Sequence, residues 1–185
     1  MMIFILIWSI WFSSEILLNI LFRSGNLDKK DQDKGTIRVI WITIGVANSL
    51  GIIFVILLKI PISNLFIIPY SGLFLIIFGM IFRFISMWTL GKFFTVHVTI
   101  RANHKIKQDG VYKLIRHPAY LGSILSFIGY GISLNNLVSL IVISIPVTMV
   151  MLYRIKIEEK LLLDHFGAEY LDYIKRTYRL IPWIY

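Results

Sequence analysis

The chain has 185 residues, of which 57% are hydrophobic and 16% charged, and its mean hydropathy is +0.77. These values exclude a soluble globular domain and indicate a protein that is integral to a lipid bilayer. The length allows one compact unit with no room for a second folded domain. The absence of cysteine excludes disulfides, thiol nucleophiles and Cys-ligated metal sites.

Five apolar segments follow one another along the chain. They cover about residues 3–22, 37–58, 65–90, 119–134 and 137–153. Because a spanning helix needs about 20 residues, the first three qualify outright, while the last two must tilt, thin the bilayer or extend into their flanks. The first segment lacks the basic start and small-residue exit of a cleaved signal, so we expect a retained helix. The pattern predicts an all-α integral membrane protein with five transmembrane helices in a single membrane-embedded domain, residues 1–185.

Lysine and arginine are distributed unevenly between the connections. Seventeen of the 19 lie in residues 23–38, 92–116 and 154–179, which the five predicted helices place on one side of the membrane. The positive-inside rule therefore predicts a multi-pass cell membrane protein with its N-terminus outside and its tail in the cytoplasm. Topology and anionic membrane lipids account for the net charge of +9, so no nucleic-acid partner is expected.

The fourth and fifth segments are separated by only two residues, Asn135 and Asn136, which predicts a tight antiparallel hairpin. One face of the fourth segment carries small residues that let another backbone approach closely in lipid. These are Gly122, Ser126, Gly129 and Ser133. After the hairpin, residues 154–178 have the spacing of an amphipathic helix pair, broken near Gly167, which we expect along the cytoplasmic face.

Residues 110–122 combine polar and aromatic side chains at the start of the fourth segment. They include Tyr112, Arg116, His117 and Tyr120. Proline is tolerated at the first position of a helix, so Pro118 marks a helix start. The free N–H groups of residues 119–121 would then point toward Arg116 and His117 and form an anion-binding corner. A carboxylate or a phosphate would fit there, although a solvated basic loop at a helix cap is the simpler interpretation of the motif taken alone.

Arg154 and Glu158 lie four residues apart on one helix face, and Glu159 adds a second acid. An ordinary surface ion pair at this spacing stabilises a helix by about 0.3–0.5 kcal/mol. At a bilayer boundary, opposite a second cationic motif, the wall of a polar cavity is the better interpretation.

Glu15 and Arg83 are charged residues inside apolar segments. Each lies seven residues before the cytoplasmic end of its segment, so both sit about 10 Å below the boundary. Their matched depth predicts a pair, either as a structural salt bridge or as part of the lining of a substrate cavity.

The sequence predicts no metal site. None of the four histidines has the spacing of a zinc site, and no acid lies near the pair His97 and His104. A Gly-x-Gly-x2-Gly turn is also absent, which excludes a soluble dinucleotide-binding fold.

Further motifs flank residues 110–122 in the last hundred residues. They are residues 90–95, His104 with Lys107, the pair Glu158 and Glu159, Phe166-Gly167 with Tyr170 and Tyr173, and Pro182. In this order the motifs resemble the isoprenylcysteine carboxyl methyltransferase family of integral membrane enzymes. The first two helices match that family only as generic membrane spans.

The resemblance implies an S-adenosylmethionine pocket in the cytoplasmic half of the hairpin region, closed by the tail. Residues 91–185 would be the cofactor-binding catalytic region and residues 1–90 the first three helices. The implied cofactor contacts are His97, His104, Lys105, Ile106, Lys107, Tyr112, His117, Pro118, Ala119, Tyr120 and Glu158. Arg154 would face a substrate carboxylate, so Arg154 and Glu158 are the predicted catalytic residues. Lys105 and Lys107 would contribute through their backbone, and no role is implied for Arg176 or Arg179.

We therefore expect methyl transfer from S-adenosylmethionine to a lipophilic or lipid-linked acceptor in the membrane. A carboxylate acceptor is preferred because Arg154 offers a cation to orient it. A phospholipid amine is the alternative, since its enzymes share similar motifs. NADPH-dependent membrane sterol reductases also resemble this region, but they should need more basic residues and more helices. A transporter or scaffold is disfavoured because the polar residues gather on one side of the membrane.

Overall fold

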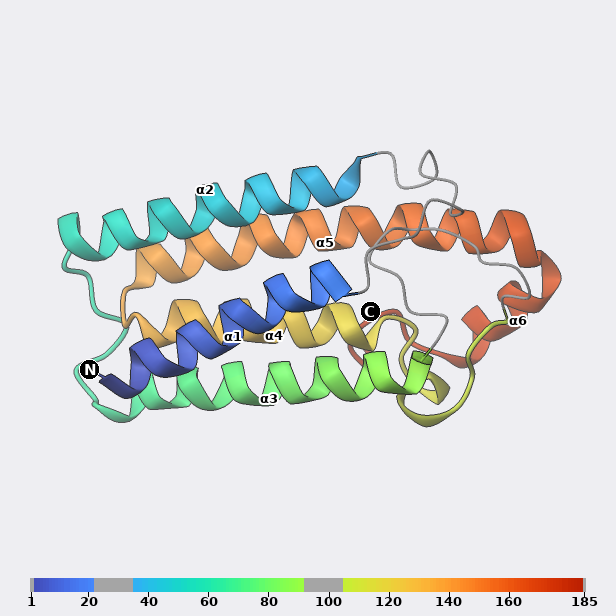
Figure 1. Ribbon diagram of the computed structural model, residues 1–185, viewed down its shortest axis with the longest axis horizontal. Coiled ribbons are helices and arrows are strands. Elements are labelled where there is room, and N and C mark those ends of the chain that lie inside the picture. Colours follow the sequence, from blue (N-terminus) through green and yellow to red (C-terminus); the bar gives the residue numbers. More distant parts are fainter. Residues whose placement is uncertain (1, 22–34, 92–104, 185) are drawn as a thin grey trace.

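The computed structural model describes residues 2–21, 35–91 and 105–184 of the chain (Figure 1). Its helices are α1 (Met2–Leu21), α2 (Thr36–Leu57), α3 (Ile67–Leu90), α4 (Pro118–Ser133), α5 (Leu137–Phe166) and α6 (Ala168–Arg176), with a 3-10 turn η3 (Gly110–Lys113). Within the described ranges there is no strand, only one isolated backbone bridge between Ile115 and Tyr178. The predicted all-α class is confirmed.

Four helices, α1, α2, α3 and α5, are long and apolar enough to cross a membrane. Helix α4 has only 16 residues and rises about 24 Å, less than the about 30 Å of a hydrocarbon core. A membrane protein with several apolar helices of sufficient length to span is therefore established, and the fifth span stays a prediction. Helix α5 has 30 residues, about 45 Å, so its charged last third extends beyond the bilayer.

Helices α3 and α4 pack backbone to backbone along the small-residue face predicted for the fourth segment. A Cβ atom added to Gly79 would lie 2.5 Å from the carbonyl oxygen of Gly122. One added to Gly72 would lie 2.6 Å from that of Gly129. No side chain fits between the two helices at these positions, and van der Waals contact of this closeness stabilises helix pairs in lipid. The partner of the small-residue face is thus α3, whereas α5 packs mainly against α2 (Figure 1).

The predicted hairpin between α4 and α5 is confirmed, and its turn also fastens the connection between α2 and α3. Asn136 caps α5 by accepting a 3.0 Å hydrogen bond from the backbone N–H of Ser139. Asn135 donates to the carbonyl oxygen of Ser63 at 3.0 Å and accepts from the N–H of Ser63 at 3.3 Å. Both asparagines therefore serve structure at the end of the bundle opposite the acidic and basic motifs.

The break predicted near Gly167 is present, but residues 154–166 continue α5 and do not form a separate helix of the tail. Gly167 adopts φ 53°, a left-handed conformation that glycine tolerates, and it separates α5 from α6. After α6 the chain returns toward the bundle (Figure 1). We refer to residues 177–184 as the C-terminal strap. Arg116 donates its backbone N–H to the carbonyl oxygen of Tyr178 at 2.8 Å, and Tyr178 donates to Leu114 at 2.9 Å, which pairs the strap with the segment before α4.

Candidate active site

A buried carboxylate, that of Glu159 on α5, contacts the two basic side chains of the anion-binding corner predicted beside α4. The N–H group of Leu121, which the prediction left free, donates to the carbonyl oxygen of His117 at 3.2 Å. The Oε1 atom of Glu159 lies 2.9 Å from Nε of Arg116 and 3.3 Å from Nε2 of His117. Its Oε2 atom lies 2.7 Å from Nη2 of Arg179 in the C-terminal strap. Glu159 is 8% exposed, so burial strengthens these charge-assisted contacts. The protein itself therefore supplies the anion that Arg116 and His117 bind.

Arg116 has a second function, which is to hold the tail. Its Nη1 atom donates a 3.2 Å hydrogen bond to the carbonyl oxygen of Ile174 on α6 and a second one to the carbonyl oxygen of Thr177. Together with Glu159, Arg116 joins α4, α5, α6 and the strap. The sequence contained no periodic signal for Arg179, because it reaches Glu159 only through the backbone pairing of the strap with residues 114–117.

Arg154 and Glu158 are connected by the hydroxyl group of Tyr120. Arg154, 3% exposed, donates from Nε to the Tyr120 oxygen at 2.9 Å. The Tyr120 hydroxyl donates in turn to Oε2 of Glu158 at 2.8 Å. This chain of two hydrogen bonds joins α4 to α5 and places a cation and a carboxylate on either side of one phenol.

Helix α2 adds a contact that the sequence did not suggest. Arg154 Nη1 donates to Oγ1 of Thr36, the first residue of α2, and Thr36 is buried. The guanidinium group is therefore bound from two helices. A threonine at the start of a helix is normally interpreted as a cap, which conceals this role.

Three buried phenols surround the acidic end of this network. Tyr173 donates its hydroxyl to the carbonyl oxygen of Tyr112 at 2.7 Å. Burial raises the pKa of Tyr112, and the Glu158 charge raises it further. Burial likewise raises the pKa of Tyr170, with added contributions from Glu159 and Glu158. All three phenols are thus neutral hydrogen-bond donors at neutral pH.

Tyr170 is the unusual member of this group. Its side chain is 1% exposed, yet its hydroxyl has no hydrogen-bond partner among the residues that the structure describes. A buried hydroxyl without a partner is costly in a folded protein. The Tyr170 hydroxyl is therefore a buried donor that the described residues leave unused.

The predicted pair of Glu15 and Arg83 is confirmed. Arg83 Nε lies 3.1 Å from Oε1 of Glu15, and Arg83 Nη1 donates to the carbonyl oxygen of Ala119 at 3.1 Å. Arg83 therefore ties α3 both to α1 and to the first turn of α4. Equal depth in the membrane, estimated from helical rise, was sufficient to identify the partners.

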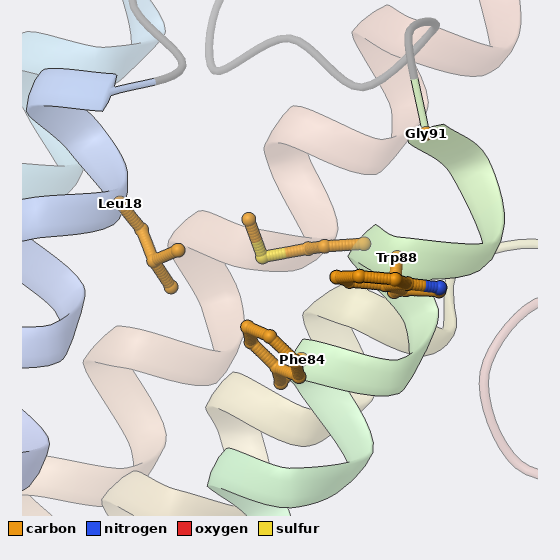
Figure 2. Close-up of a pocket in the computed structure, with 5 residues that line it drawn as sticks. Leu18, Phe84, Trp88 and Gly91 are labelled. Carbon is orange, nitrogen blue, oxygen red and sulfur yellow. The ribbon is translucent and has the colours of Figure 1, made fainter.

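An apolar pocket of about 300 Å³ lies between the ends of α1 and α3, lined by Leu18, Phe84, Met87, Trp88 and Gly91. Figure 2 shows Leu18 and Phe84 pointing toward the same gap from opposite helices. Leu18 follows Glu15 by three residues and Met87 follows Arg83 by four, so the pocket adjoins the ion pair on the same helix faces. Nothing in the sequence distinguished these side chains from ordinary lipid-facing residues.

The structure links Tyr120, Arg154 and Glu158 by hydrogen bonds, and the ring of His117 lies 5.8 Å from that of Tyr120. The charge of Glu158 contributes to the raised pKa of Tyr112. Pro118 and Ala119 are buried at the start of α4. Ile106 is half-buried, Lys105 is exposed, and Lys107 forms a 3.0 Å ion pair with Asp109. His97 and His104 lie outside the described residues. Among the described residues, no three histidine, aspartate or glutamate side chains form a group that could hold a metal ion.

Comparisons with known proteins point to one family. Residues 72–164 match the model of the isoprenylcysteine carboxyl methyltransferase (ICMT) family. Protein-S-isoprenylcysteine O-methyltransferase B of Arabidopsis thaliana is 35% identical over 110 residues, covering 58% of this chain and 56% of the relative. The Saccharomyces cerevisiae protein-S-isoprenylcysteine O-methyltransferase is 36% identical, covering 58% of this chain and 46% of the relative.

A solved structure is also similar. The eukaryotic intramembrane Ras methyltransferase ICMT superposes with a TM-score of 0.62 at 25% identity, over 86% of this chain and 55% of the other. The chain thus spans about half the length of the relatives that it matches. The matched region includes α4, most of α3 and nearly all of α5, and so contains Tyr120, Arg154 and Glu158.

Proposed function

Since the chain belongs to the isoprenylcysteine carboxyl methyltransferase family, we propose that it transfers a methyl group from S-adenosylmethionine to a carboxylate on a lipophilic acceptor in the membrane. The observation that carries this proposal is the chain of hydrogen bonds from Arg154 through Tyr120 to Glu158. It provides a buried cation for one reactant and a carboxylate for the other at the end of a membrane bundle. The relatives' names supply the acceptor class.

The residues near Glu158 fit S-adenosylmethionine. A cationic molecule with its own carboxylate needs an acid and neutral donors, and Glu158 is flanked by the raised-pKa phenols of Tyr112 and Tyr170. The unpaired Tyr170 hydroxyl is a donor that such a ligand would satisfy. When bound, S-adenosylmethionine supplies an electrophilic methyl group on a sulfonium centre. His97 and residues 104–107, together with residues 117–120, would complete the pocket.

His117 contributes to this pocket through Glu159. Its ring is buried against that carboxylate, so in our proposal it fixes the start of α4 and leaves the cofactor to the backbone N–H groups of Ala119 and Tyr120 and to Glu158. The first N–H groups of a helix have no partner within the helix and suit an anionic group of the ligand.

Arg154 orients the acceptor carboxylate in this proposal. A carboxylic acid is ionised at pH 7, so the chain needs no general base to activate it. The work of the protein is to hold the two reactants about 3–3.5 Å apart and to exclude water, which strengthens the orienting charges. Burial of Arg154 beside Tyr120 and Thr36 supports the second requirement, the exclusion of water.

The apolar part of the acceptor would lie in the membrane. The pocket between α1 and α3 offers it a surface of aliphatic and aromatic side chains. With α4 as a fifth span, the lysine and arginine distribution supports an N-terminus outside the cell membrane and a site that faces the cytoplasm.

A methyl-transfer assay on the purified protein tests the proposal. The methyl donor is radiolabelled S-adenosylmethionine, and the acceptors are a short prenylated cysteine with a free carboxylate, its carboxamide, and phosphatidylethanolamine. We expect base-labile label on the carboxylate acceptor and none on the carboxamide. Base-stable label on phosphatidylethanolamine would establish the amine alternative. Tighter binding of NADPH than of S-adenosylhomocysteine would contradict methyl transfer altogether.

A further inference from the structure

The last four described residues form a tight turn with an unusual residue at its tip. Ile184 donates its backbone N–H to the carbonyl oxygen of Ile181 at 3.1 Å, with Pro182 and Trp183 between them. Trp183 has φ 64°, a left-handed conformation that turns of this kind usually assign to glycine or asparagine. A large aromatic residue is disfavoured there. An unusual backbone conformation of this kind persists only where its surroundings stabilise it. The contacts of the Trp183 side chain should therefore explain it.

The position of the turn along the bundle is set by the strap. His117 donates its backbone N–H to the carbonyl oxygen of Arg179 at 3.2 Å, immediately before Pro118 begins α4. Leu180 is buried and belongs to the apolar core of the bundle. The turn that follows is therefore level with the start of α4, where the membrane-spanning part of the molecule ends. Figure 1 accordingly draws the C-terminus back beside the helices, away from α6.

The turn exposes apolar side chains at this level. Trp183 is 82% exposed and Ile184 78%, and Ile181 and Leu114 are also exposed. The ring centroids of Trp183 and Tyr178 lie 5.8 Å apart, so the exposed tryptophan ring is supported on one side by the ring of Tyr178. Lys113 precedes Leu114 in the sequence, and Arg179, which pairs with Glu159, follows Tyr178. Exposed tryptophan and lysine side chains at the level of a membrane boundary are typical of a surface that meets lipid headgroups.

We propose that residues 181–184 form an interfacial anchor, in which Trp183 and Ile184 insert into the headgroup region of the bilayer beside α4 and so hold the C-terminal strap over the site. The positive charge of this end of the bundle favours anionic headgroups. A turn of four residues is too small for the about 800 Å² per partner that a stable protein interface buries. The inference depends on the membrane fold and not on the identity of the methyl acceptor.

Because the chain contains no cysteine, one introduced cysteine can carry a nitroxide label without background. We choose Ile184→Cys, with Lys175→Cys on the polar surface of α6 and Met149→Cys on the exposed apolar face of α5 as controls. Each protein is reconstituted into vesicles of phosphatidylcholine and phosphatidylglycerol. Collision of the label with oxygen, which prefers lipid, and with a nickel chelate, which stays in water, is then measured.

The anchor predicts that the label at position 184 lies between the two controls, with nickel collisions several-fold fewer than at 175 and more frequent than at 149. Adding Trp183→Gly, which suits the backbone of the turn but removes the ring, should raise the nickel collisions at 184. Equal collisions at 184 and 175 would overturn the proposal, as would no change on adding Trp183→Gly. Spin–spin broadening at 184 that disappears on dilution with unlabelled protein would show that a second copy covers the turn, and would also overturn it.

Discussion

At the scale of single residues, the hydroxyl of Tyr120 links the charged side chains of Arg154 and Glu158. It accepts a hydrogen bond from Arg154 and donates one to Glu158. A substitution of either charged residue therefore also alters the hydrogen bonding of Tyr120, and through it that of the other residue. Their proposed roles remain separable, because Arg154 would meet the acceptor and Glu158 the cofactor. Two predictions distinguish them.

Glu158→Gln should weaken binding of S-adenosylhomocysteine by roughly 1.5–3 kcal/mol, because a charge-assisted bond to the ligand's ammonium group is lost. The amide can still accept from Tyr120, so the fold should be retained. Calorimetry on detergent-purified protein measures the affinity, with Asp172→Asn on exposed α6 as the matched control. Unchanged affinity and unchanged thermal stability would leave Glu158 as a surface residue without a role in the site.

Arg154→Lys should reduce turnover at least about tenfold, which corresponds to about 1.4 kcal/mol, while S-adenosylhomocysteine affinity stays nearly intact. Lysine keeps the charge but cannot donate to Tyr120 and Thr36 as a planar fork. Thr36→Val should have a smaller effect of the same kind, since it removes one of the two supports. Single-turnover methyl transfer measured beside cofactor binding separates the steps. A loss confined to cofactor binding would contradict the acceptor-side role.

At the scale of elements, Glu159 joins three segments that are distant in the sequence. Arg116 and His117 precede α4, and Arg179 belongs to the strap. A buried carboxylate shared by several cations is strongly coupled to the fold, because removing it leaves positive charges without compensation.

Glu159→Gln should therefore lower the free energy of unfolding by about 3–5 kcal/mol. Thermal unfolding in detergent measures this, and limited proteolysis should cut the strap before the helices. Breaking the exposed pair of Asp172 and Lys175 by Asp172→Asn is the control, expected to change stability by less than about 1 kcal/mol. If the two variants unfold alike, the buried cluster does not hold the strap.

A double-mutant cycle tests the link between α1 and α3. Glu15→Gln and Arg83→Gln should each destabilise the protein, and the double variant should cost less than the sum of the two. The reason is that each single change leaves one partner of a partly buried pair uncompensated. Strict additivity in thermal unfolding would mean that the two side chains do not interact in the membrane.

At the scale of the whole molecule, the buried phenols make stability depend on alkaline pH. Burial raises the pKa of Tyr170, and the charges of Glu159 and Glu158 add to the shift. Above about pH 10 the unfolded chain loses this proton before the folded one does, so stability that is complete below pH 10 declines as pH rises. Tyr170→Phe should make the decline shallower and keep or raise stability at neutral pH, because it removes a buried hydroxyl that has no partner among the described residues. An equally steep decline in pH-dependent thermal unfolding would contradict this.

Much of this molecule was predictable because lipid imposes simple constraints. Hydropathy located the apolar helices, helical rise paired Glu15 with Arg83, and four-residue spacing placed Arg154 and Glu158 on one face. The remaining contacts depend on how the chain returns in three dimensions. Arg179 reaches Glu159 only because the strap pairs with residues 114–117, and α3 rather than α5 meets the small-residue face of α4. Periodicity within one segment carries no information about either partner.

The glycine contacts between α3 and α4 have a mechanical consequence. Where the carbonyl oxygen of Gly122 meets Gly79, neither helix can slide or tilt without a backbone collision. Helices α3 and α4 should therefore move together as one rigid unit. Helix α1 has no such seam. Among the described residues its main attachments are ring contacts, such as that of Trp11 with Phe127 at 4.8 Å, the hydrogen bond from Trp8 Nε1 to Oγ of Ser133 at 3.0 Å, and the ion pair to Arg83. Side chains can change rotamer, whereas backbones in direct contact cannot move apart as easily. Helix α1 is therefore the more mobile wall of the bundle. A bulky molecule entering from the lipid would displace α1 before it displaced α3 and α4.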